Sequence, residues 1–257
     1  MRRKVNLKNG SSNHLDSDRD KVEEKIIGIL GGMGPEATAD LFYRIIKATT
    51  VKRDQDHPRT IIYSNSKVPD RTPAILRDGP SPLPEMVRAA RALETAGADF
   101  IIIPCNTAHH FIGELRGSVG IPILHMIELT AKKVGRRLPG MKRAGLIATD
   151  GTVKSGIYDK GFYGQGIEII VPHVDLQRAS MEAIYEHIKT GDLEGGRKIV
   201  LKVAKNLINH GAQAVICGCT EISLVLKDRD LAVPVIDPLQ ILAETAVGVA
   251  LGRIRLE

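Results

Sequence analysis

Short apolar runs and longer amphipathic stretches alternate along most of the chain, with glycine or proline between them. The short runs predict buried strands, and the longer stretches, whose apolar residues recur at helical spacing, predict helices. Because the strands are almost entirely apolar and alternate with helices, we expect an α/β protein with parallel sheets covered on both faces. The predicted strands lie at 26–32, 60–66, 100–106, 121–126, 143–152, 167–172, 214–221 and 233–238, those at 143 and 214 running on into loops, and the predicted helices at 36–50, 83–97, 109–116, 128–138, 180–191, 195–213 and 239–255, with a proline-rich loop at 69–84.

Two of the predicted strands are near copies of each other. "GADFIIIPCNT" (97–107) and "GAQAVICGCT" (211–220) each place a Gly-Ala pair at the same distance before a cysteine, and each is followed by an "(I/V)P(I/V)" strand. The interval from Gly28 to Cys105 also nearly equals that from Gly145 to Cys219. These matches predict an internal repeat of about 110 residues and two related α/β halves.

The repeat places two thiols at the carboxyl ends of equivalent strands. Ligands of open parallel sheets bind beyond those ends, so two facing halves would put Cys105 and Cys219 on either side of one cleft. Such thiols can work as base and acid: one removes a proton from a carbon and the other returns a proton from the opposite face, which inverts the carbon. Free cysteine is more often a small core residue, and Cys217, inside the apolar run "AVIC", is interpreted that way.

Two other kinds of site compete with this interpretation. The cysteines together with His109 could offer metal ligands, but the chain has no Cys-x-x-Cys pair, and a structural zinc needs four ligands. "GILGGMGPEA" contains a degenerate dinucleotide-binding pattern, yet the acid expected after the next strand is replaced by Ser64, Asn65 and Ser66. A nicotinamide-dependent oxidoreductase and a non-catalytic amino-acid-binding protein therefore remain as alternatives, while no metal is expected.

The amino-acid composition further narrows the kinds of ligand and of cellular location that we expect. The chain of 257 residues is 43% apolar, and its net charge of +6 fits an anionic small substrate better than nucleic acid, since only 4% of its residues are aromatic. None of the apolar runs is long enough to span a membrane, and three cysteines suit reduced thiols in the cytoplasm. Residues 1–25 are polar and aperiodic, and we expect them to form a disordered tail.

Several motifs in combination resemble the aspartate/glutamate racemase family. They are "IGILGGMGPEAT", "PDRTPAIL", "IPCNTAHHF", "HIKTGD" and "ICGCTEI", and the resemblance covers residues 26–257. "GGMGP" resembles the aspartate racemase branch: Met33 and Glu221 stand where the glutamate racemase branch has a serine of its "DSG" start and a histidine. The resemblance implies catalytic thiols at Cys105 and Cys219 and substrate-binding residues at Met33, Arg71, Asn106, Thr107, Thr149, Thr152, Lys189 and Thr220, with Arg71 and Lys189 on the substrate carboxylates.

The family also implies an overall organisation and an activity. It predicts a first domain formed by 26–125 and 238–257, a second formed by 126–237, and a homodimer. We therefore expect a racemase that interconverts L- and D-aspartate, or glutamate, by a two-thiol mechanism without pyridoxal phosphate, another cofactor or metal. Hydantoin racemisation and maleate isomerisation are the alternatives within the superfamily.

Overall fold

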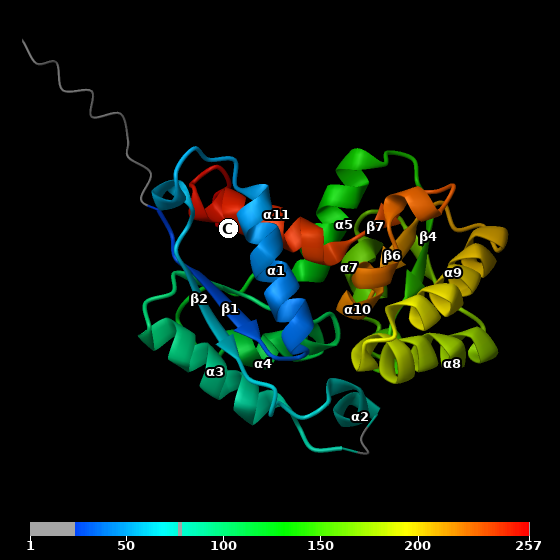
Figure 1. Ribbon diagram of the computed structural model, residues 1–257, viewed down its shortest axis with the longest axis horizontal. Coiled ribbons are helices and arrows are strands. Elements are labelled where there is room, and N and C mark those ends of the chain that lie inside the picture. Colours follow the sequence, from blue (N-terminus) through cyan, green and yellow to red (C-terminus); the bar gives the residue numbers. More distant parts are fainter. Residues whose placement is uncertain (1–23, 77–78, 257) are drawn as a thin grey trace, which may run out of the picture.

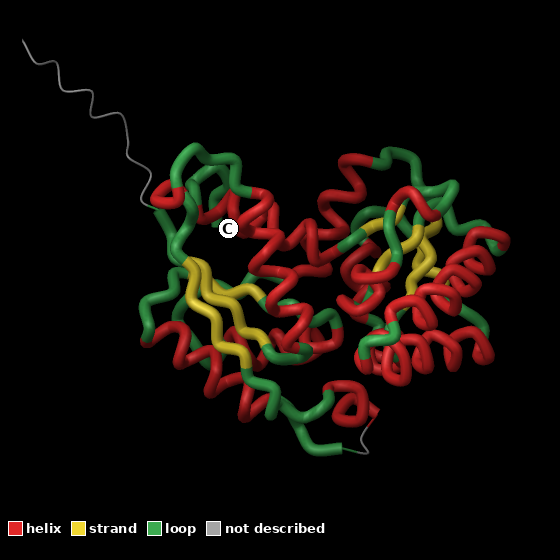
Figure 2. Tube along the Cα trace, in the orientation of Figure 1, coloured by secondary structure: helices red, strands yellow, loops and turns green. Residues whose placement is uncertain are grey.

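The structure is a computed structural model that describes residues 24–76 and 79–256. Its strands form two parallel sheets, one with the order β2-β1-β3 and the other with the order β5-β4-β6-β7. Figure 2 shows these sheets as two separate groups of strands, each with helices on its outside. The predicted α/β fold with two parallel-sheet halves is thus confirmed, whereas the predicted tail at 1–25 lies, apart from its last two residues, outside the described part of the chain.

The first sheet is built around β1. This strand is fully buried and pairs in parallel with β2 on one side and β3 on the other. Helix α1 begins at Pro35, where proline's fixed φ and missing N–H suit the first helical turn. The elements of this half are β1 (Ile27–Gly31), α1 (Pro35–Ala48), β2 (Thr60–Ser64), α2 (Arg71–Leu76), α3 (Leu83–Thr95), β3 (Phe100–Ile102) and α4 (Ile112–Arg116), with 3₁₀ turns at Asp54–Asp56 and Thr107–Phe111.

The second sheet repeats this arrangement around β4, which pairs with β5 and β6. Its elements are α5 (Met126–Arg137), β4 (Arg143–Ile147), α6 (Asp150–Ser155), α7 (Ile157–Tyr163), β5 (Glu168–Ile170), α8 (Val174–Glu182), a π-helical turn (Ala183–His187), a 3₁₀ turn (Ile188–Thr190), α9 (Leu193–Asn209), β6 (Val215–Cys217), α10 (Thr220–Val225), a 3₁₀ turn (Asp228–Asp230), β7 (Val235–Ile236) and α11 (Pro238–Ala250).

The repeated Gly-Ala pairs end two equivalent helices. Gly97 and Gly211 follow α3 and α9 with φ of +92° and +93°, a left-handed conformation that glycine adopts without the steric cost of a Cβ. At both ends the alanine N–H bonds back into the helix, from Ala98 to Leu93 and from Ala212 to Leu207. Both pairs therefore terminate a helix and turn the chain into β3 or β6.

Helix α11 returns from the second sheet to the first. Figure 1 shows it running from the end of β7 toward α1, and its side chains share a buried cluster with β1, β3 and α1. Met126, at the start of α5, belongs to the same cluster. The division into domains at residues 126 and 238 stays a prediction. No helix among the described residues is long and apolar enough to cross a membrane.

Three predicted elements differ from the structure. The strand expected at 121–126 is a single bridge between Ile101 and Ile123, because Pro122 has no N–H to extend a hydrogen-bond ladder. The helix expected at 180–191 begins earlier, at Val174, and changes into the π-helical turn at Ala183. The helix expected at 109–116 starts as a 3₁₀ turn. Helices α2, α6, α7 and α10 were not predicted, since each has at most seven residues and little room for a periodic apolar face.

Candidate active site

Cys105 and Cys219 lie beyond the carboxyl ends of β3 and β6, which occupy equivalent places in the two sheets. Cys105 follows β3 and precedes the 3₁₀ turn at Thr107, while Cys219 follows β6 and is the N-cap of α10. Both side chains are buried, with 6% and 8% of their surface exposed. The two thiols line the same enclosed void, so the facing arrangement expected from the repeat is present.

The void is formed by both halves and is almost closed. Its volume is about 10 Å³, roughly the space one water occupies, so no amino acid fits in this arrangement. A larger vestibule of about 340 Å³ adjoins it and reaches the surface at Pro35, Glu36 and Ser66. The void is lined by Met33, Asp70, Arg71, Thr72, Cys105, Asn106, Thr107, Thr149, Tyr185, Lys189, Cys219, Thr220 and Glu221.

Nearly all the residues that the family resemblance implied are on this list. Met33, Arg71 and Lys189 lie where the void meets the vestibule, because they line both spaces. Thr152 does not line the void, but its hydroxyl lies 2.8 Å from that of Thr107 and 3.1 Å from that of Thr149. The three threonines therefore form a triangle of hydroxyl groups that joins the two halves beside the thiols.

Arg71 brings a buried positive charge to the Cys105 side. It is the first residue of α2, is 8% exposed, and donates to the backbone oxygens of Met33 and Pro69 at 3.0 and 2.9 Å. Burial opposes its charge, but Cys105 and Asp70 outweigh that effect, so the pKa of Arg71 lies above its ordinary value. Its Nε has no hydrogen-bond partner among the described residues, which leaves one donor for a ligand.

Asn106 offers a second unused donor. Its Oδ1 accepts a 2.6 Å hydrogen bond from the phenol of Tyr158, a fully buried residue of α7 in the other half. This bond fixes the orientation of the amide, and Nδ2 has no partner within the described part of the chain. A carboxylate bound in the void could accept from this group and from Arg71.

Glu221 faces the other thiol. The Cys219 Sγ donates to Glu221 Oε2 at 2.8 Å, and the Thr220 hydroxyl donates to the same oxygen at 3.2 Å. Burial first, and then the charge of Glu221 and this hydrogen bond, raise the pKa of the Cys219 thiol well above its ordinary value. Sequence reasoning noticed Glu221 only as a difference between family branches.

Tyr185 lines the void from the second half. Its hydroxyl donates to Asp70 Oδ2 at 3.0 Å and lies 3.4 Å from the Thr72 hydroxyl, which joins the second half to the first. The Lys189 ammonium lies 4.3 Å from the centre of the Tyr185 ring, a cation–π contact. The sequence analysis missed Tyr185 and Tyr158, although Tyr185 stands four residues before Lys189, one helical turn away.

Cys217 and His109 are structural. Cys217 is the last residue of β6 and is completely buried in the core of the second half, and burial raises the pKa of its thiol. His109 is 1% exposed, with Nδ1 2.8 Å from the Cys105 carbonyl oxygen and Nε2 accepting from the Met126 N–H at 3.1 Å. His109 therefore holds the backbone of Cys105 in place. Among the described residues no group of three or more His, Cys, Asp or Glu side chains could hold a metal ion.

The glycine-rich loop after β1 is shaped by packing. A Cβ at Gly32 would lie within 2.4 Å of the backbone of Asn65, so the loop touches the end of β2 directly. That close contact accounts for glycine at this position without a bound dinucleotide.

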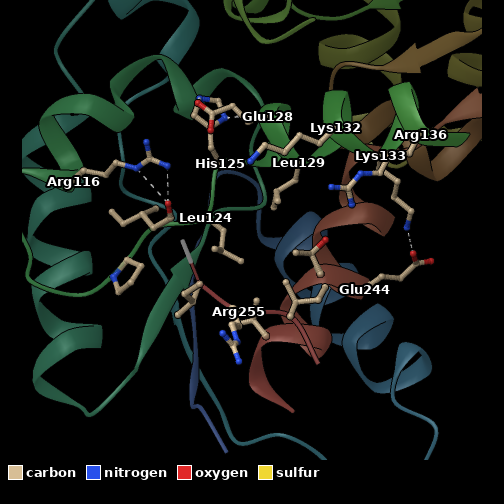
Figure 3. Close-up of a pocket in the computed structure, with 16 residues that line it drawn as sticks. Arg116, Leu124, His125, Glu128, Leu129, Lys132, Lys133, Arg136, Glu244 and Arg255 are labelled. Atoms are coloured by element: carbon tan, nitrogen blue, oxygen red, sulfur yellow. Dashed lines mark hydrogen bonds and ion pairs between the residues drawn. The ribbon is translucent and has the colours of Figure 1, made fainter. Parts of the chain in front are cut away.

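A larger cavity of the described structure lies away from the thiols. It has a volume of about 580 Å³, and Figure 3 shows it between α5, α11 and the C-terminal segment, with the side chains of Arg116, His125 and Lys132 around it. In the same view Lys133 contacts Glu244. None of its lining residues also lines the void between Cys105 and Cys219.

Comparison with known proteins assigns the chain to one protein family. A family model described as Asp/Glu/Hydantoin racemase matches residues 30–246, and the chain belongs to that family. It is an amino-acid racemase, an isomerase that works without pyridoxal phosphate. The resemblance noted from the sequence motifs is thus confirmed.

Individual relatives cover nearly the whole chain. A protein named broad specificity amino-acid racemase RacX, from Bacillus subtilis, is 32% identical over 88% of this chain and 99% of its own length. Among solved structures, the aspartate racemase of Picrophilus torridus is 32% identical, has a TM-score of 0.80, and matches over 91% of this chain and 96% of its own. A putative Asp/Glu racemase from Yersinia pestis is 29% identical, with a TM-score of 0.73 over 88% and 99% of the two chains.

Proposed function

We propose that this racemase interconverts L- and D-aspartate, using Cys105 and Cys219 as the two acid–base groups and no cofactor or metal. The observation that supports the proposal is that two thiols, from equivalent strand ends of the two halves, line one enclosed void. One sulfur, as thiolate, removes the α-hydrogen, and the thiol on the other side protonates the opposite face of the carbon. The product is the other enantiomer.

The groups around the thiols suit a dicarboxylate. Removal of the α-hydrogen places negative charge on the α-carboxylate, and donors already oriented toward it would stabilise that charge. The Nε of Arg71 and the Nδ2 of Asn106 are buried donors without partners in the described chain, and the threonine hydroxyls lie beside them. Lys189, at the junction with the vestibule, is a second cation for the side-chain carboxylate.

Similarity favours aspartate among the possible amino acids. The Picrophilus torridus relative is named an aspartate racemase, whereas the Bacillus subtilis relative is named a racemase of broad specificity. Glutamate is therefore the second substrate to test. A hydantoin is a neutral ring without a carboxylate for Arg71 or Lys189, so these two cations favour the dicarboxylic amino acids.

Substrate entry requires the halves to separate. The void holds about one water, and the Tyr185–Asp70 bond joins the two halves in its lining. We infer that the described state is a closed, substrate-free one, and that after entry the halves close again over the substrate, with water excluded and one sulfur on each side of the α-carbon. The family resemblance also supports a homodimer, which light scattering at several concentrations would test.

Proton NMR in deuterated water is the decisive experiment. Reduced enzyme is given L-aspartate or L-glutamate without added cofactor, and chiral chromatography follows the enantiomers. Loss of the α-hydrogen signal together with formation of the D-enantiomer identifies the substrate. Exchange without inversion contradicts the two-thiol mechanism. If neither amino acid exchanges, the proposed substrate is wrong, and hydantoins and maleate are tested next.

A further inference from the structure

The Glu221 carboxylate is hydrogen-bonded directly to the Cys219 thiol. It is 7% exposed, and both described partners of its Oε2 are side chains of the site: the Cys219 thiol at 2.8 Å and the Thr220 hydroxyl at 3.2 Å. An acid in the first turn of a helix ordinarily stabilises the free backbone N–H groups there. The contacts of Glu221 are instead with the proton-bearing atom of Cys219.

Two buried side chains of opposite charge, Arg71 and Glu221, line the void together with the thiols. The Glu221 carboxylate accepts a hydrogen bond from the Cys219 thiol, whereas the buried Arg71 guanidinium lines the void together with Cys105. A cation favours the thiolate form of a neighbouring sulfur, and a carboxylate favours the thiol. The titratable groups that face Cys219 from the surrounding elements are Glu221 on α10, Lys189 on the 3₁₀ turn, Tyr185 on the π-helical turn, Tyr158 on α7 and Cys105 after β3.

We propose that Glu221 is a positioning residue that keeps Cys219 as the protonated thiol in the free enzyme, so that in the two-thiol mechanism Cys105 is the sulfur that acts first as the base. This inference rests on the proposed two-thiol function. The two sulfurs are then unequal, and the free enzyme is prepared mainly for the enantiomer whose α-hydrogen points at Cys105.

The proton balance of one turnover shows the consequence. The Cys105 thiolate takes the α-hydrogen, so an S–H bond forms while the C–H bond breaks and its electron pair stays on the substrate. The Cys219 S–H bond then breaks as its proton goes to the other face of the carbon. A Cys219 thiolate now lies beside the Glu221 carboxylate, and the repulsion between the two anions favours return to the starting proton distribution.

The test measures how the alkylation rate of each cysteine thiol depends on pH. Free enzyme is alkylated with iodoacetamide over a series of pH values, and peptide mass mapping gives the rate at Cys105, Cys219 and the core residue Cys217. We expect Cys219 to react only at a pH above the usual range of a cysteine thiol. Glu221→Gln removes the carboxylate charge and should move the Cys219 profile down by about one pH unit or more. An unchanged Cys219 profile would overturn the proposal.

Matched controls separate this effect from a general disturbance. Glu36→Gln makes the same change in the vestibule, away from the thiols, and should leave both profiles in place. Cys217 should stay unreactive, since its alkylation reports an opened fold. If Glu221→Gln opens the fold, Glu221→Asp replaces it: the shorter carboxylate withdraws from the sulfur and should give a smaller shift in the same direction, and no shift would contradict the proposal.

Kinetics provide a second readout. The equilibrium constant of a racemisation is one, so kcat/KM must be equal for the two enantiomers, and unequal sulfurs show as different individual kcat and KM values. Glu221→Gln should bring the two kcat values closer together. Alkylation uses no substrate, so a wild-type enzyme that fails to racemise aspartate disproves the proposed substrate, whereas an unmoved Cys219 profile disproves the role of Glu221.

Discussion

Tyr185 in the second half donates a hydrogen bond of 3.0 Å to Asp70 in the first half, and both residues line the void between the thiols. Tyr185 belongs to a π-helical turn, in which one extra residue widens the helix and redirects the side chains that follow. The same turn places the Tyr185 ring beneath the ammonium group of Lys189. The π-helical turn therefore places both the bond between the two halves and the contact with the Lys189 ammonium group.

Removing the Tyr185 hydroxyl should weaken closure. Tyr185→Phe keeps the ring under Lys189 and deletes the bond to Asp70, which is worth about 1 kcal/mol. We expect kcat/KM for aspartate to fall about fivefold in both directions, mainly through KM. Steady-state kinetics check this, with Tyr163→Phe, at an 87% exposed position, as the control. An unchanged KM would show that the bond does not hold the closed state.

Either catalytic thiol should be indispensable, while the core thiol should not. Cys105→Ala and Cys219→Ala each remove one acid–base group, and we expect racemisation to fall by a factor of at least 10². Cys217→Ala tests the third cysteine, whose side chain is packed in the core. It should retain racemisation and lose only thermal stability. Wild-type rates in Cys105→Ala would rule out the two-base mechanism.

His109 should matter to stability more than any surface histidine. Its Nε2 accepts from the Met126 N–H, so Nδ1 carries the hydrogen and donates to the Cys105 carbonyl. His109→Ala leaves both buried backbone groups without partners and should cost about 2–4 kcal/mol of the free energy of unfolding. Urea titration measures this, and His110→Ala, on an exposed neighbour, should change the value little. Equal effects of the two substitutions would contradict the structural role.

Stability should decline below pH 6.5. Burial lowers the pKa of His109 to about 3 and that of His125 to about 4, while both have an ordinary pKa of 6.5 when unfolded. Between these values the unfolded chain binds more protons, so the free energy of unfolding falls as the pH falls. Urea unfolding at several pH values should show this slope, and His125→Gln should flatten it. A slope unchanged by that substitution would exclude His125 as a source.

The sequence predicted the repeat and the place of both cysteines because these depend on local signals. Gly97 and Gly211 each end a helix before a buried strand, and that pattern is visible in the letters alone. The partners of the thiols could not be predicted so well. Tyr185 meets Asp70, and Tyr158 meets Asn106, only after the two halves pack against each other. Helix α10 was missed because its six residues are too few for a periodic pattern.

The two related halves also match the symmetry of the chemistry. The enantiomers of an amino acid are mirror images, so an ideal racemase would present the same group to each face of the carbon. In the proposed mechanism a pair of equivalent strand ends does this with Cys105 and Cys219, one from each half. Arg71 and Glu221, which differ in charge, are where the chain departs from that symmetry. In the proposed mechanism the two related halves thus provide an acid–base group for each direction of the reaction, and the difference between Arg71 and Glu221 makes the two groups unequal in the free enzyme.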